Sequence, residues 1–180
     1  GVTTGMPIWE ALPICPDGVY VKRDFSWYEV LSRKLLALIK EQSPRVEFYS
    51  IDEMFFTTQG ADIGEAKGLQ RAIARLIGVP ASVGIAPTKT LAKLCSDSAK
   101  PLGCKVVGSE SQRVALLEGL PVTEVSGIGG RSAAKLAQHG IVTCDQFASA
   151  QRAFIRWLLH KPGEDLWWEL NATPVLEVLP

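Results

Sequence analysis

The sequence predicts an α+β fold, in which a layered α/β unit with helices on one face of a mostly antiparallel sheet precedes a small all-α unit. Helical and strand-like patterns alternate from residue 25 to about residue 107. Beyond that point the strand-like runs disappear, and short helices separated by turns continue to the end. Because strands and helices are segregated in this way, we expect two structural units with a boundary near residue 108.

The first part of the chain carries separate signals for two helices and a strand pair. A short helix is expected at 8–12, and the following irregular segment ends in the strand-like run 19–21. Ser26 and Glu29 have the spacing of a capping box, which predicts that the next helix begins there. Residues 45–58 are rich in β-branched and aromatic side chains, which predicts strand.

The remaining elements follow from helical periodicity and from glycine and proline stop signals. We expect helices at 66–77 and 88–99, strands at 81–86 and 105–107, and then only helices, at 110–118, 132–138, 145–150, 152–160 and 164–170. Trp157, Trp167 and Trp168 recur at helical spacing with leucines, so we interpret them as core residues of the helical unit.

Composition excludes several classes of protein. The chain has 180 residues, of which 47% are apolar and 21% charged, with 16 glycines and 11 prolines, so it is neither disordered nor collagen-like. No apolar run approaches the roughly 20 residues that span a bilayer, and the first residues lack the pattern of a signal peptide. The four cysteines lie far apart, which disfavours a zinc site and indicates free thiols in a reducing cytoplasm.

The net charge is zero, with 19 basic and 19 acidic residues, and as a single number it argues against a nucleic-acid partner. The charges are nevertheless unevenly distributed. Residues 1–66 hold six basic and ten acidic residues, whereas residues 67–105 hold seven and one and residues 126–161 hold five and one. The segments 67–105 and 126–161 are therefore positively charged although the net charge of the chain is zero.

Asp52 and Glu53 are adjacent carboxylates within an apolar, strand-forming stretch. Burying either one would be costly without a positive partner, and in a straight strand they would point to opposite faces. A tight bend at residues 51–53 would place both at the sheet edge, where they could hold hard cations such as Mg²⁺. An ordinary hairpin turn with two solvated acids fits the same pattern.

Two further motifs could bind phosphate. Lys100 follows the helix 88–99, where a lysine also interacts favourably with the helix dipole. The run 84–89 lacks the second glycine of a phosphate loop, which excludes a Walker motif. In the joint 126–132, glycines would leave backbone N–H groups free at a helix start, as in a helix-hairpin-helix that holds a nucleic-acid backbone. A plain turn between two helices is the alternative.

Taken in this order, these motifs resemble the Y-family translesion DNA polymerases, the UmuC and DinB group, with details closer to UmuC. The motif at 49–53 is similar to the family's carboxylate motif, the runs 82–89 and 97–101 to its second palm signature, and 126–129 to its thumb hairpin. Residues 5–11 and 15–17 resemble the connection from fingers to palm, so the resemblance extends from residue 1 to about residue 172.

The resemblance implies four segments: a remnant of the fingers at 1–26, a palm at 27–107 without its first strand, a thumb at 108–172, and the start of a linker to a little-finger domain at 173–180. In the family, the segment before this start carries another metal-binding aspartate, an aromatic steric gate, and a tyrosine and an arginine that grip the triphosphate. The 180-residue chain is therefore expected to be a fragment that does not polymerise alone.

For the full-length protein, the resemblance implies two-metal nucleotidyl transfer opposite damaged template, in DNA repair and the SOS response. Primer–template DNA, deoxynucleotides and two Mg²⁺ ions are the implied ligands. A sliding clamp and a recombinase filament are the implied partners, in the bacterial cytoplasm at the nucleoid and without a membrane. The implied catalytic and metal-binding residues are Asp52 and Glu53, the nucleotide-binding residues Lys100 and Gly5, and the DNA-binding residues Ser50, Gly127, Ile128, Gly129 and Arg131.

Three other functions compete with polymerisation. A non-catalytic DNA-repair accessory protein could use the same scaffold, although the acidic motif is present here. A pure helix-hairpin-helix module would explain only residues 108–172, and a nucleotidyl cyclase with a similar palm-like layer would not need a thumb.

Overall fold

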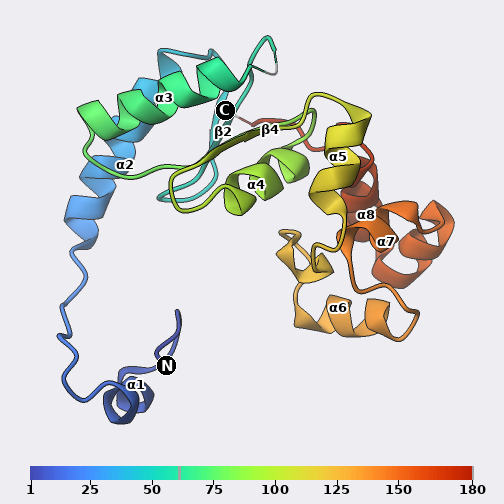
Figure 1. The fold of residues 1–180 in the computed structure, drawn as a ribbon, viewed down its shortest axis with the longest axis horizontal. Helices are drawn as coiled ribbons and strands as arrows, with labels where there is room; N and C mark the ends of the chain where they lie inside the picture. Colours follow the sequence, from blue (N-terminus) through green and yellow to red (C-terminus); the bar gives the residue numbers. More distant parts are fainter. Residues whose placement is uncertain (61, 180) are drawn as a thin grey trace.

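In the part of the chain that the structure describes, helices are combined with two small sheets, and the strands all precede the helical half (Figure 1). The structure, a computed structural model, describes residues 1–60 and 62–179. The helices are α1 (Ile8–Ile14), α2 (Phe25–Lys40), α3 (Ile63–Leu76), α4 (Lys89–Ser98), α5 (Glu110–Leu117), α6 (Gly130–Ala137), α7 (Cys144–Ser149) and α8 (Arg152–Leu170), with a 3₁₀ turn η1 (Val122–Glu124). The strands are β1 (Val46–Phe48), β2 (Met54–Phe56), β3 (Val83–Ile85) and β4 (Cys104–Val106). The mixed α/β class and the change to helices are as predicted.

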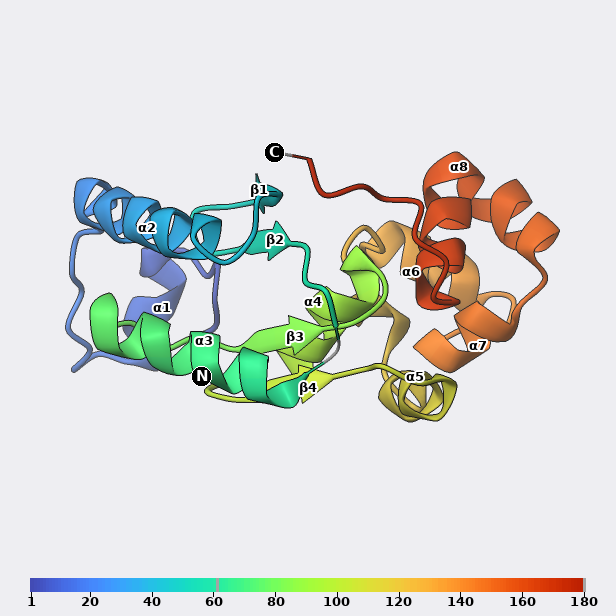
Figure 2. The ribbon, with the colours of Figure 1, turned by 90° about the horizontal axis from the view of Figure 1, so that it is seen from above.

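The predicted mostly antiparallel sheet is wrong in detail. β1 and β2 pair antiparallel with Val46 opposite Phe56, but β3 and β4 pair parallel with Val83 opposite Cys104. The parallel pair arises because α4 carries the chain back across the strands, so that β4 enters in the same direction as β3. Helices also lie on both faces, since α3 and α4 flank the β3–β4 pair from opposite sides (Figures 1 and 2).

Side-chain caps start several of the helices, α2 and α4 among them, and one predicted cap is wrong. The expected capping box of Ser26 and Glu29 does not start α2, because the Asp24 carboxylate accepts a hydrogen bond from the Trp27 N–H at 2.9 Å and caps the helix two residues earlier. At α4 the Thr88 hydroxyl caps Leu91 N–H at 3.3 Å. This cap fixes the start of the helix that carries the later site residues.

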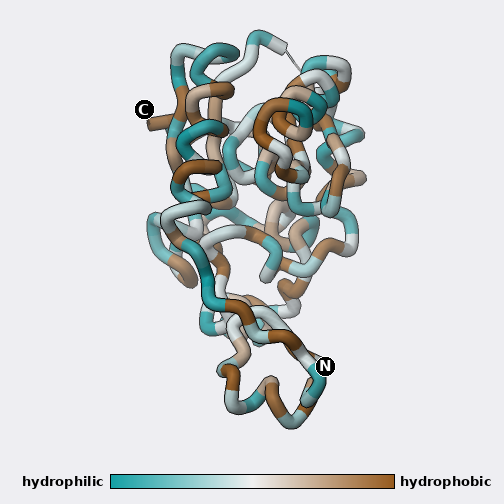
Figure 3. The backbone as a smooth tube through the Cα atoms, turned by 90° about the vertical axis from the view of Figure 1, so that its left-hand side faces the viewer, coloured by the Kyte–Doolittle hydropathy of each residue, from teal (hydrophilic) through white to brown (hydrophobic). Residues whose placement is uncertain are grey.

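The first 24 residues extend away from the rest of the fold, and Figure 3 shows apolar stretches along them. Helix α1 confirms the short helix expected at 8–12, whereas the strand-like run 19–21 forms no strand. Trp9 is 74% exposed, so this segment has no packed core of its own around that side chain.

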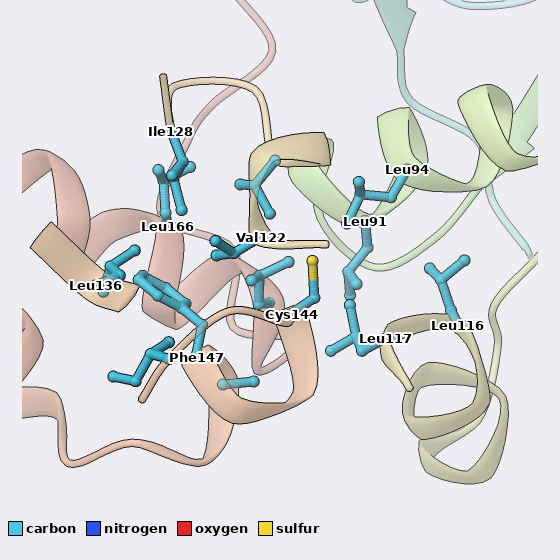
Figure 4. Packing of buried hydrophobic residues seen from close by; sticks show 14 of the residues in the cluster. Leu91, Leu94, Leu116, Leu117, Val122, Ile128, Leu136, Cys144, Phe147 and Leu166 are labelled. Carbon is cyan, nitrogen blue, oxygen red and sulfur yellow. The ribbon is translucent and has the colours of Figure 1, made fainter. Parts of the chain in front are cut away.

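The main buried cluster lies between α4 and the helical half (Figure 4). Leu91 and Leu94 of α4 belong to a cluster that includes residues from every later helix, and Phe147 and Leu117 are almost fully buried within it. The two sequence-defined units therefore share one core across residue 108.

Helix α8 breaks at His160, whose φ of 61° is non-helical, so the two helices expected at 152–160 and 164–170 are its two halves. The prediction that three tryptophans form the core is wrong for Trp157, which is 67% exposed and lies two residues, about 200° around a helix, from the buried Ile155. Trp167 does pack inward, and its indole N–H donates to the Ala150 carbonyl at 2.9 Å.

Candidate functional site

The paired carboxylates lie on the turn that joins β1 to β2. The Tyr49 and Ser50 N–H groups both donate to the Glu53 carbonyl, at 3.1 and 3.0 Å, which closes a tight bend over residues 49–53. The Ser50 hydroxyl donates to Asp52 Oδ1 at 2.8 Å and orients that carboxylate. The predicted bend is therefore present, with Asp52 exposed and the Glu53 side chain 34% exposed at the edge of the sheet.

Glu53 has a positive partner that the sequence analysis did not identify. Lys93 Nζ lies 2.5 Å from Glu53 Oε1 and 3.2 Å from Asp97 Oδ2, and Lys100 Nζ lies 2.7 Å from Asp97 Oδ1. Four charges of alternating sign thus run from the carboxylate turn to Lys100. The lysines and Asp97 are spaced at i, i+4 and i+7, so they lie on one face of α4 and its C-terminal turn.

The proton affinities of this network follow from its contacts. Burial raises the pKa of the Asp97 carboxyl, but hydrogen bonds from Lys100 and Lys93 outweigh burial and hold that pKa below its usual value. Burial lowers the pKa of Lys93, yet contacts with Glu53 and Asp97 outweigh it and leave the pKa of the ammonium raised. Both groups are therefore charged at neutral pH.

A cavity of about 630 Å³ brings the carboxylates and Lys100 together. Asp52 and Glu53 line it from the turn, and Asp97 and Lys100 line it from the end of α4. Apolar side chains of α2 form another wall of the cavity: Tyr28, Leu31 and Leu35. One side of this cavity is thus negative and open to a cation, and the adjacent side carries an exposed ammonium.

Asp52 and Glu53 offer the oxygen donors that Mg²⁺ prefers. Within residues 1–60 and 62–179, no group of three or more histidine, cysteine, aspartate or glutamate side chains is arranged to hold a metal. The two carboxylates fit a hard cation that takes its remaining ligands from water or phosphate oxygens. They do not form a closed structural metal site.

The sheets have open edges beside this turn. Among the residues that the structure describes, β2 pairs with β1 alone and β3 with β4 alone. A second cavity, of about 140 Å³, lies between β2 and β3 and is lined by Phe55, Val83 and Gly84, with Leu35 and Ile73 from α2 and α3. Backbone groups along both facing edges therefore have no strand partner within residues 1–60 and 62–179 (Figure 2).

The glycine joint precedes α6. Gly127 has a φ of +100°, which favours glycine, and Gly129 caps α6 without any side-chain hydrogen bond. The Ile128 side chain is 3% exposed and packs with the apolar core beside Leu166, so only its backbone is available for the predicted phosphate contact (Figure 4). Arg131 is exposed.

The joint approaches the carboxylate turn, while Gly5 does not. Tyr49 Oη lies 3.4 Å from Ser126 Oγ, which links the turn between β1 and β2 to the residue before the glycines. Gly5, with a φ of +83°, lies in the extended N-terminal segment and does not line the cavity of Asp52 and Lys100.

No helix in the described part of the chain is long and apolar enough to cross a membrane.

Comparison with known sequences gives a consistent set of relatives. Residues 1–97 match the model of the impB/mucB/samB family. The chain is 37% identical to a protein of Oceanobacillus iheyensis named DNA polymerase IV, over 96% of this chain and 42% of that protein. It is 35% identical to DNA polymerase IV 1 of Bacillus subtilis, over 96% of this chain and 42% of that protein. The chain thus spans about two fifths of the length of these relatives.

Solved structures give the same result. The chain is similar to a post-insertion binary complex of Dbh DNA polymerase, with a TM-score of 0.83 and 27% identity over 99% of this chain and 54% of that chain. It is also similar to DinB from Sulfolobus solfataricus, with a TM-score of 0.76 and 26% identity over 94% and 52% of the two chains.

Proposed function

Given that the chain belongs to the impB/mucB/samB family, we propose that it supplies the catalytic turn of a Y-family DNA polymerase, which adds deoxynucleotides opposite damaged template in DNA repair. The observation that carries the proposal is the single cavity in which Asp52, Glu53 and Lys100 meet. Neither a plain hairpin turn nor a helix-dipole lysine requires these three side chains to share one cavity.

In the proposed reaction, a primer 3′-hydroxyl attacks the α-phosphate of a deoxynucleotide and pyrophosphate leaves. Two Mg²⁺ ions, when bound, activate the hydroxyl and stabilise the leaving group. Asp52 and Glu53 would hold the metal ions through their oxygens, and the Ser50 hydroxyl keeps Asp52 oriented. Lys100, whose side chain is 63% exposed at the cavity, would neutralise the triphosphate.

The open edges of β2 and β3 support the proposal that residues 27–107 form a palm completed by a further strand of the full-length protein. The family resemblance implies that such a strand brings another acidic metal ligand. Residues 1–26 would then be part of the fingers, residues 108–172 the thumb, and residues 173–180 the start of a linker. The 180-residue chain would not extend primers without the remainder.

We propose that the glycine joint holds one DNA strand by its phosphates. The uncapped start of α6 at Gly129 presents backbone N–H groups, and Arg131 adds an exposed positive charge. Ile128 serves this role from inside, because its buried side chain anchors the joint to the core. Gly127 permits the turn, and the Tyr49–Ser126 contact keeps the joint near the carboxylates.

The finer assignments also stay proposals. A closer relationship to UmuC than to DinB is a prediction that the similar structure named DinB weighs against. A sliding clamp, a recombinase filament and a role in the SOS response follow only from the family resemblance, as does a nucleotide contact by Gly5.

Primer extension by the full-length protein tests the function. Asp52→Ala or Glu53→Ala should abolish template-directed extension while primer–template affinity stays within a few-fold, because the acids act on the reaction and not on the DNA. Glu118→Gln, an exposed acid of the helical half, is the matched control and should extend normally. Equal loss of binding and extension would mean that the acids are structural, and DNA binding without extension by the wild type would favour the accessory protein.

A further inference from the structure

Asp97 is the only acidic residue among the eight charged residues of the segment 67–105, and it contacts two of the seven basic ones. Its two carboxylate oxygens are divided between them. Oδ1 lies 2.7 Å from Lys100 Nζ, and Oδ2 lies 3.2 Å from Lys93 Nζ. Because the lysines lie four residues before and three residues after it, the helix places all three on one face. Asp97 therefore connects the lysine of the triphosphate site to the lysine that contacts Glu53.

The two contacts of Asp97 differ in burial. The Lys93 side chain is 19% exposed and is held by Glu53 as well, at 2.5 Å. The Lys100 side chain is 63% exposed and has Asp97 as its ion-pair partner. An exposed lysine–carboxylate pair is weak in water, whereas separating a half-buried charge from its partners is costly. Lys100 is therefore the member of this network that can leave.

The charge balance of this network allows Lys100 to leave Asp97 at low cost. Glu53, Lys93, Asp97 and Lys100 carry two negative and two positive charges, so Lys100 is a neutralised cation while it rests on Asp97. If Lys100 moves to a polyphosphate in the cavity, Asp97 and Glu53 still share Lys93. Neither carboxylate is then left without a positive partner, which keeps the cost of the transfer low.

We propose that Asp97 is a positioning residue that holds Lys100 at the cavity until the phosphates of a nucleotide take its ammonium, while Lys93 stays between Asp97 and Glu53. This inference rests on the proposed polymerase function. Asp97 then has two opposite effects. It competes with the nucleotide for Lys100, which weakens ground-state binding, and it fixes Lys93 and thereby Glu53, which favours the reaction step.

The test is a split between affinity and rate in the full-length protein on a primer–template. Deoxynucleoside triphosphate with Ca²⁺ gives the dissociation constant, and single-turnover incorporation with Mg²⁺ gives the rate. Asp97→Asn should tighten nucleotide binding about 2- to 5-fold, the range expected for loss of one exposed competing pair. It should slow incorporation by about 10-fold, because Glu53 loses part of its support.

Three further variants make the assignment specific. In a Lys100→Met background, Asp97→Asn should no longer tighten binding, because no ammonium remains to be released. Asp97→Glu keeps the charge and should restore the wild-type dissociation constant. Asp165→Asn is the matched control, since Asp165 pairs with Lys161 outside the cavity at the i, i+4 spacing of Lys93 and Asp97, and its loss should change neither quantity.

Several results would overturn the proposal. An unchanged or raised dissociation constant for Asp97→Asn would show that Asp97 does not compete for Lys100, and tightening that persists in the Lys100→Met background would do the same. Both results require a wild-type protein that binds nucleotide and extends primers. A wild type that does neither refutes the polymerase function itself, and this inference with it.

Discussion

Replacing Gly84 with alanine should disrupt the junction on which the candidate site is built. A Cβ atom at Gly84 would lie 2.1 Å from the Ala92 carbonyl oxygen, 2.5 Å from the Ser96 nitrogen and 2.8 Å from Cys95 Cβ. Two of these atoms belong to the backbone of α4, so no flexible side chain can move aside. Strand β3 and helix α4 must separate, and α4 carries Lys93, Asp97 and, at its end, Lys100.

The size of the effect follows from overpacking. Extra atoms in a well-packed interior cost about 1–3 kcal/mol, and contact with backbone on two residues places Gly84→Ala near 3 kcal/mol. For a chain of this length, 1 kcal/mol corresponds to about 2–4 °C in Tm, so the midpoint should fall by about 6–12 °C. Thermal and urea unfolding of the 180-residue chain measure the loss.

Gly68→Ala in α3 is the matched control, because a Cβ at Gly68 meets no atom within 4 Å. Alanine favours the helix over glycine by about 1 kcal/mol, so this variant should raise Tm slightly. If Gly84→Ala melts within 2 °C of the wild type, the close approach of β3 to α4 is incorrect and the placement of Lys93 and Lys100 fails with it.

Three other predictions concern stability and DNA binding. Glu169 is fully buried and accepts hydrogen bonds from three backbone N–H groups. Glu169→Ala should therefore lower the free energy of unfolding by about 3 kcal/mol and speed proteolysis of residues 171–179. An unaltered urea midpoint would contradict this prediction. Burial raises the pKa of Glu47, but hydrogen bonds from Lys89 and the Leu179 N–H outweigh it and lower that pKa. Its stabilisation is therefore complete above the unfolded-state pKa near 4.5 and lost as pH falls through the lower folded value, and Glu47→Gln should flatten the acid limb of a pH–stability curve. Ile128→Ala should lower the free energy of unfolding by about 3 kcal/mol, because the side chain is buried. Arg131→Ala should leave Tm unchanged but weaken DNA binding and reduce its salt dependence by about one phosphate contact. The reverse pattern would make Arg131 the structural residue and Ile128 the DNA-binding one.

The carboxylate turn could be predicted from the sequence because burying two adjacent charged carboxylates inside a sheet costs much free energy. Two adjacent acids in an apolar strand must either meet cations or leave the sheet, and the bend at 49–53 takes them to its edge, beside Lys93. The mixed class and the helical second half follow equally from periodicity. These features depend on residues that are close together in the chain.

The features that escaped prediction depend on long-range contacts. Glu53 and Lys93 are 40 residues apart, and nothing in the local pattern shows that the two side chains meet. The parallel pairing of β3 and β4 depends on how α4 crosses the strands, which hydropathy does not specify. Trp157 has the spacing of a core residue, but the face of α8 that is buried is set by packing against other helices.

The most direct test of catalysis at the carboxylate turn is single-turnover incorporation by the full-length protein with Glu53→Gln, measured beside its primer–template affinity. The variant keeps the shape of Glu53 but removes the charge that faces Lys93 and would hold a metal ion. If Glu53 holds a catalytic metal ion, incorporation should fall 100-fold or more while DNA affinity stays within a few-fold of the wild type. Incorporation at the wild-type rate would show that the turn at 49–53 is not the catalytic site.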